Sequence, residues 1–193
     1  FPEERPIFLR EYSTDHYSVL SYLVYRLFME AVNTGIQVAI LVTLVYYMVA
    51  FQGSVFIYYA ATYALSMSAT AMAVLLGVVS KGNAKIAQQL LPLLFVPQIM
   101  FSGFFVSPNL IPDFLRWAQY VCVLTYAVRL LILEEFQNCS DNFFENASCQ
   151  LLVDNVKADP NDTWFYWLMM VVYFFFVRLL ALALLQKSAK KFY

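Results

Sequence analysis

Four long stretches of this sequence contain almost no charged side chains, and they constrain the fold more than any other feature. A helix of about 20 apolar residues can cross the roughly 30 Å hydrocarbon core of a bilayer. The whole chain is 62% hydrophobic and only 13% charged, whereas a soluble domain has about 25% charged residues. We therefore predict an all-α membrane protein with about four transmembrane helices. The predicted spans are residues 31–51, 54–79, 84–106 and 164–185.

The first apolar region begins well before the first predicted span. A helix over residues 17–51 would be about 50 Å long, which exceeds the hydrocarbon thickness. Its first half contains Arg26 and Glu30, which are four residues apart and can pair on one helix face. That face is either a solvated surface or a docking face for a cytosolic partner. We expect residues 1–30 to be cytosolic or interfacial, with an amphipathic helix over Glu3–Tyr12.

Charge and glycosylation motifs predict the same topology. With four spans and a cytosolic N-terminus, the external region 107–163 contains eight acidic but only three basic residues, and the other basic residues except Arg178 are cytosolic. Three N-glycosylation motifs, at Asn138, Asn146 and Asn161, fall in that external region. A fifth crossing within 117–133 would put these motifs and the lysine-rich C-terminal end on the wrong sides. We therefore predict a re-entrant or external helical pair over residues 108–136.

The three cysteines fit this topology. Cys139 and Cys149 flank the second glycosylation motif on the oxidising side, so a disulfide-bearing outer loop is plausible, with two unpaired thiols as the alternative. Cys122 lies in an apolar segment and is expected to be a packed free thiol.

Motifs for catalysis are missing from this sequence. It has one histidine, His16, and no glycine-rich phosphate loop, metalloprotease motif or C-x-x-C pair. We predict no catalytic residue, no metal site and no cofactor bound by this chain, so it is not an enzyme by itself. The net charge of -1 also gives no sign of nucleic-acid binding.

Several polar side chains lie inside the predicted spans. Gln88, Gln89 and Gln98 share the third span with two prolines, which should bend the helix. The glutamines could line a translocation pathway or hydrogen-bond between helices, and the sequence favours neither. Arg178 lies about two turns inside the last span, where we expect its side chain to snorkel to the cytosolic headgroups.

Two further patterns concern packing and the membrane surface. The second span has small residues at four-residue spacing, which is typical of close helix packing in lipid. They are Ala60, Ala64 and Ser68 on one line and Ala69, Ala73 and Gly77 on another. An aromatic belt at the outer interface is predicted from Trp164, Tyr166 and Trp167.

These features together resemble the C-terminal part of the membrane domain of a G-subfamily ABC transporter, the white/brown half-transporter group. The resemblance runs over nearly the whole chain in order and spacing. The motifs are Phe8-Leu9-Arg10-Glu11-Tyr12, Tyr17-Ser18-Val19-Leu20-Ser21-Tyr22 with Glu30, Tyr46-Tyr47-Met48, Phe101-Ser102-Gly103-Phe104-Phe105-Val106 with Ile111-Pro112 and Trp117, Thr125-Tyr126-Ala127, Glu135-Phe136, and the Cys139, Asn146, Cys149 loop.

The resemblance implies the translocating part of an ATP-driven exporter of lipids, sterols or other amphipathic compounds. It implies ATP and Mg²⁺ in a nucleotide-binding domain of the same parent protein, and a second half-transporter as partner. By this resemblance Phe8, Arg10 and Glu11 belong to the coupling helix that docks on the ATPase domain. The substrate cavity is lined by Pro92, Val96 and Ile99, and the apolar plug is formed by Phe104 and Phe105.

Two other classes remain as alternatives. A four-span scaffold of tetraspanin type normally has a Cys-Cys-Gly signature and at least four loop cysteines, whereas this loop has two. A passive channel usually has rings of charge or a carbonyl filter, and we find neither in this sequence. The chain begins with Phe1, so we interpret it as a piece of a longer multi-pass protein. We expect that protein in the plasma membrane or an endomembrane of the secretory system.

Overall fold

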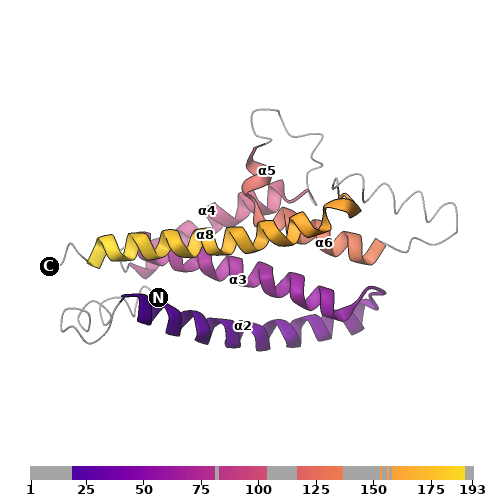
Figure 1. Cartoon of the computed structure of the whole chain (residues 1–193), viewed down its shortest axis with the longest axis horizontal. Coiled ribbons are helices and arrows are strands. Elements are labelled where there is room, and N and C mark those ends of the chain that lie inside the picture. Colours follow the sequence, from indigo (N-terminus) through magenta and orange to yellow (C-terminus); the bar gives the residue numbers. More distant parts are fainter. Residues whose placement is uncertain are drawn as a thin grey trace, which may run out of the picture.

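A computed structural model describes residues 19–80, 83–103, 117–136, 153, 156 and 158–189 of the chain. These residues form helices and contain no strand. The elements are α2 (Val19–Val49), α3 (Val55–Val79), α4 (Ala84–Phe101), α5 (Ala118–Val121), α6 (Val123–Phe136), the 3-10 helix η3 (Pro160–Asp162) and α8 (Thr163–Ala189), as Figure 1 shows.

Three of the described helices are long and apolar enough to cross a membrane. They cover Val24–Val49, Val55–Val79 and Pro160–Lys187, close to three of the predicted spans. Helix α2 begins at Val19, before the membrane boundary predicted at residue 31, as expected of a helix whose first half lies outside the hydrocarbon, and the boundary itself stays a prediction. The fourth predicted span corresponds to α4, whose 18 residues are about 27 Å long. The helix continues through Pro92 and Pro97, and its role as a span stays a prediction.

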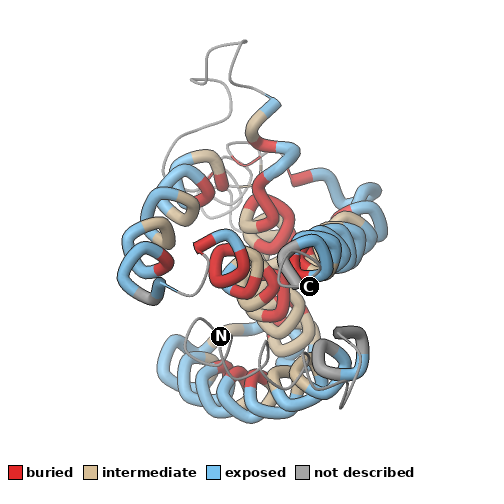
Figure 2. The backbone as a smooth tube through the Cα atoms, turned by 90° about the vertical axis from the view of Figure 1, so that its left-hand side faces the viewer, coloured by how far each residue is buried: buried red, intermediate tan, exposed pale blue. Residues whose placement is uncertain are grey.

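The helices run side by side, and α3 lies at their centre. It contacts α2, α4, α6 and α8, and the end-on view in Figure 2 shows buried backbone concentrated there. Ala61, Ser68 and Ala71 of α3 are fully buried. Of the small residues predicted for close packing, Ser68 and Gly77 are buried, Ala60, Ala64 and Ala69 are half-buried, and Ala73 is exposed.

The outward faces of the helices are apolar. Tyr47, Met48, Phe56 and Phe176 are among many large hydrophobic side chains that are more than half exposed. A water-soluble protein rarely exposes a continuous apolar surface of this extent. Contact with lipid tails explains the distribution, and we conclude that this is an integral membrane protein.

The described ends of the bundle agree with the predicted topology. The start of α2 and the end of α8 lie at one end of the molecule, and the turn between α2 and α3 lies at the other (Figure 1). Helix α6 has 14 residues and packs against both α3 and α8 near the α2–α3 turn. At about 21 Å, α6 is too short to cross the hydrocarbon core by itself. Helices α5 and α6 lie within the helical pair predicted over residues 108–136, whose re-entrant or external position stays a prediction.

One residue of the predicted aromatic belt, Tyr166, is buried in the core beside α6. Trp164 is 75% exposed, as a belt residue should be, but Tyr166 is only 2% exposed. Tyr166 packs with Tyr126 and Met170, its hydroxyl oxygen accepts a hydrogen bond from the Asp159 backbone N–H, and the Arg129 guanidinium lies over its ring. Tertiary packing turned this tyrosine inward.

Cys122 lies between α5 and α6 and is a buried free thiol, as predicted. Burial raises the pKa of the Cys122 thiol to about 11. Only the thiolate is nucleophilic, so about 100-fold less of it is present at neutral pH than for a thiol with the reference pKa of 9.0. We expect maleimide labelling of Cys122, followed by mass spectrometry of its peptide, to be slow in the folded protein. Labelling should become fast after denaturation, and equal rates in both states would contradict the buried position.

Candidate functional site

The side chains predicted to line a substrate cavity share one face of α4. Pro92, Val96 and Ile99 follow each other at four- and three-residue spacing, which places them on one side of a helix. All three are exposed, Val96 at 54% and Ile99 at 39%. Ala87 and Gln98 lie on the opposite side of α4 and are buried. The predicted cavity residues therefore form a surface that points away from the described bundle.

The three glutamines of α4 divide between the two alternatives left open by the sequence. Gln98 is buried on the side of α4 that faces the bundle, which fits a role between helices. Gln88 and Gln89 are exposed on the same side of α4 as Val96. The exposed face of α4 is thus apolar near Val96 and Ile99 and polar near Gln88 and Gln89. Such a face is a suitable lining for a site that binds amphipathic molecules.

A cluster of charges joins α2 to α8. The Glu30 carboxylate binds the Arg26 guanidinium at 3.0 Å, as predicted, and also accepts a hydrogen bond from Arg178 Nη2. The Arg178 side chain is 10% exposed and lies against the Phe174 ring. The expectation that Arg178 snorkels to the headgroups is therefore wrong. An acid on a neighbouring helix neutralises the guanidinium inside the protein, which removes the reason for reaching water.

Two adjacent glutamates at the end of α6 hold the turn between α2 and α3. Glu135 Oε2 accepts hydrogen bonds from the Tyr58 hydroxyl at 2.5 Å and from the Gly53 backbone N–H at 3.4 Å. Glu134 Oε1 accepts from the Ser54 backbone N–H at 2.8 Å. We call these two glutamates and residues 52–54 the turn clamp. It fixes the α2–α3 turn to α6 across 80 to 83 residues of sequence.

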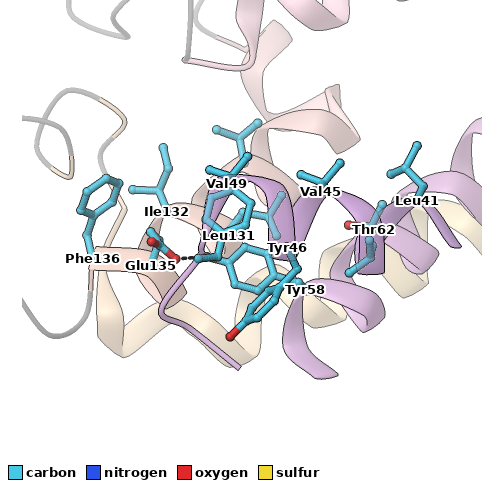
Figure 3. A pocket seen from close by; sticks show the side chains of 13 residues that line it. Leu41, Val45, Tyr46, Val49, Tyr58, Thr62, Leu131, Ile132, Glu135 and Phe136 are labelled. Atoms are coloured by element: carbon cyan, nitrogen blue, oxygen red, sulfur yellow. Dashed lines mark hydrogen bonds between the residues drawn. The ribbon is translucent and has the colours of Figure 1, made fainter. Parts of the chain in front are cut away.

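An apolar cavity lies beside the turn clamp. It has a volume of about 510 Å³ and is lined by α2, α3 and α6. Figure 3 shows Val45, Tyr46 and Leu131 on its walls and Glu135 at one end, where the dashed line marks the bond to Tyr58.

The match to a family model supports the resemblance seen in the sequence. Residues 1–136 match the ABC-2 type transporter family. The chain belongs to this family. It is 25% identical over 209 residues, 100% of its length, to ABC transporter G family member 1 of Dictyostelium discoideum, and 26% identical over 156 residues, 77% of its length, to the broad substrate specificity ATP-binding cassette transporter ABCG2 of Mus musculus.

The relatives also identify the subfamily and show how much of a transporter this chain represents. Pleiotropic drug resistance protein 1 of Petunia hybrida is 24% identical over 161 residues, 82% of this chain. The matched regions cover only 26%, 24% and 11% of the Dictyostelium, mouse and petunia proteins. The chain is therefore an ABC-2 transmembrane domain of the G subfamily, about a quarter or less of the length of these relatives. Such a domain is the membrane part of a transporter and is not catalytic itself.

Most of the other predicted site residues of this ABC-2 domain lie outside the described residues. These are the coupling residues Phe8, Arg10 and Glu11, the plug residues Phe104 and Phe105, the cysteines Cys139 and Cys149, and the glycosylation sites Asn138 and Asn146. Asn161 is described and exposed in η3, where its side-chain amide donates to Asp159 Oδ1 at 3.1 Å.

Sequence reasoning missed the turn clamp and its cavity. The signals were a Gln52-Gly53 turn and two acids ending an apolar segment, Glu134 and Glu135. Nothing in the local pattern connects those two sites, which lie about 80 residues apart.

Proposed function

We propose that this chain is the membrane-spanning, substrate-translocating part of an ATP-driven exporter of lipids, sterols or other amphipathic compounds. The observation that carries the proposal is the exposed face of α4 in a chain that belongs to the ABC-2 family. Apolar side chains next to exposed glutamines suit cargo that is itself part apolar and part polar. The family match disfavours a tetraspanin-type scaffold.

The remaining parts of the transporter follow from this reading. ATP and Mg²⁺ are bound by a nucleotide-binding domain of the same parent protein, and Phe8, Arg10 and Glu11 transmit its motion. A second half-transporter faces the α4 surface of Pro92, Val96 and Ile99 across a central pathway, which Phe104 and Phe105 close. The loop with the proposed disulfide between Cys139 and Cys149, and with glycans at the external asparagines, lies outside the cell or in the lumen of the secretory system.

The range of cargo is the least specific part of the proposal. The mouse relative's name states broad substrate specificity, and the petunia relative's name states pleiotropic drug resistance. The test is ATP-driven transport by the complete parent protein in proteoliposomes, with a panel of labelled lipids, sterols and drugs. Uptake of none of them, in protein that hydrolyses ATP and is correctly inserted, would contradict an exporter of amphipathic compounds.

The exposed α4 face supplies the first transport prediction. Val96→Trp adds an indole at the centre of that face, and we expect it to obstruct the pathway and lower transport by about tenfold, equivalent to about 1.4 kcal/mol. The matched control is Leu179→Trp, because Leu179 is exposed on α8 and is expected to face lipid. Transport by Val96→Trp equal to that of the control, at equal expression, would exclude this face from the pathway.

The second transport prediction concerns coupling. Glu11→Ala removes a carboxylate from the proposed contact with the ATPase domain, so we expect ATP-dependent export to fall while surface expression stays normal. Glu3→Ala, in the same predicted helix, is the control and should keep export. Normal export by well-expressed Glu11→Ala protein would rule out the coupling role.

A further inference from the structure

The cavity beside the turn clamp has no role in the proposed function, and we propose that it binds a lipophilic cation from the outer half of the bilayer. Its volume of about 510 Å³ falls within the roughly 300–1,000 Å³ of small-molecule sites. Leu41 and Val45 form its rim on α2 and are 55% and 40% exposed. The cavity therefore opens on the apolar surface, where a membrane-dissolved molecule could enter.

The charge of the cavity selects the sign of its ligand. Glu135 lines the cavity, and Glu134 lies next to it in sequence and binds the same turn. Among the residues that the structure describes, the ion pairs are Arg26–Glu30 and Arg178–Glu30, so neither of these two glutamates has a cationic partner there. Their hydrogen bonds come from neutral donors, the Tyr58 hydroxyl and backbone N–H groups. A cation in the cavity would supply the missing countercharge, whereas an anion would be repelled.

Aromatic rings strengthen the same preference. The Phe51 and Tyr58 rings stack with centroids 4.9 Å apart, and the Tyr46 ring meets Tyr58 edge-on at 6.0 Å. All three side chains line the cavity. The face of an aromatic ring attracts a cation, most strongly where water is excluded. A ligand with an apolar body therefore matches the apolar and aromatic walls of this cavity, and a delocalised or amine positive charge on that ligand matches Glu135 at its end.

This site is separate from the proposed translocation face. No residue of α4 lines the cavity, and Val96 and Ile99 lie on α4. Binding here requires neither ATP nor transport, so the inference goes beyond the proposed function and can fail independently of it.

The experiment measures equilibrium binding of tetraphenylphosphonium to the complete parent protein in nanodiscs without ATP, with empty nanodiscs as background. Tetraphenylborate, which has nearly the same shape and the opposite charge, is the comparison probe. We expect saturable phosphonium binding and at least about tenfold weaker borate binding. Equal binding of the two ions would overturn a cation site.

Two variants locate the binding. Val45→Trp fills the cavity from α2, and we expect it to weaken phosphonium binding by about tenfold or more. Leu44→Trp is its matched control, because Leu44 is 59% exposed on the same helix and does not line the cavity. Glu135→Gln keeps an acceptor for the turn and should reduce the preference for phosphonium over borate, with the melting temperature recorded to verify folding. Unchanged phosphonium affinity in folded Val45→Trp protein would place the ligand elsewhere and overturn the proposal.

Discussion

Glu30→Ala is expected to destabilise this membrane domain by about 3–5 kcal/mol, because it removes the anion that neutralises a buried guanidinium. Glu30 is the described carboxylate that pairs with Arg178, whose side chain is 10% exposed. Two further nitrogens of Arg178, Nε and Nη1, are buried without a hydrogen-bond partner among the described residues. The measurement is thermal and denaturant unfolding of the purified protein, with monodispersity on size exclusion as a check.

We also expect the two partners of this ion pair to differ in how much stability their substitution costs. Arg178→Leu leaves Glu30 bound to Arg26 at 3.0 Å, so we expect a smaller loss of stability than for Glu30→Ala. The double variant Glu30→Leu/Arg178→Leu replaces the pair with apolar side chains and should recover most of the loss. A double variant as unstable as Glu30→Ala, or a Glu30→Ala protein as stable as the wild type, would show that the ion pair does not hold α2 and α8 together.

Gly53→Val is expected to disrupt the turn clamp and cost about 1–3 kcal/mol, as overpacking does in other well-packed sites. A Cβ at Gly53 would lie 2.8 Å from Glu134 Cγ, 2.9 Å from the Tyr58 ring and 3.1 Å from the Glu134 carbonyl oxygen. The glutamate side chain can move, but the ring is held by its stacking on Phe51 and its bond to Glu135. The turn must therefore shift away from α6.

The matched control for this prediction is Gln52→Val at the preceding, exposed position. It introduces the same side chain in the same turn and should change the melting temperature by much less. The comparison uses thermal unfolding together with protease sensitivity at the turn. If the two variants melt alike, the close contact of Gly53 with α6 does not contribute to stability.

Local features of the sequence were enough to predict most of the helices. The apolar stretches 54–79 and 164–185 correspond closely to α3 and α8, because transfer to lipid depends on summed hydrophobicity over about 20 residues. The sides of charges and glycosylation motifs led to a predicted helical pair over residues 108–136, and α5 and α6 lie within it. A first helix longer than the hydrocarbon thickness was likewise expected from the apolar region 17–51, and α2 covers Val19–Val49.

The candidate site was only partly predictable. Pro92, Val96 and Ile99 were assigned to a substrate cavity through the family resemblance. The structure adds that they share an exposed face of α4. Tyr166 was assigned to the membrane surface because aromatic residues are common there, but packing against Tyr126 buried it. Residue type alone could not distinguish these two environments.

The sequence by itself determined that this chain enters a membrane, which three helices are long and apolar enough to cross it and which transporter family it belongs to, because hydrophobicity and motifs are properties of neighbouring residues. Only the tertiary structure decided which polar groups from distant parts of the sequence meet. Glu30 and Arg178 are separated by 148 residues, and Gln52 and Glu135 by 83. Such contacts form when particular helix faces pack together, so the buried ion pair, the turn clamp and the cavity beside it became visible only in the folded chain.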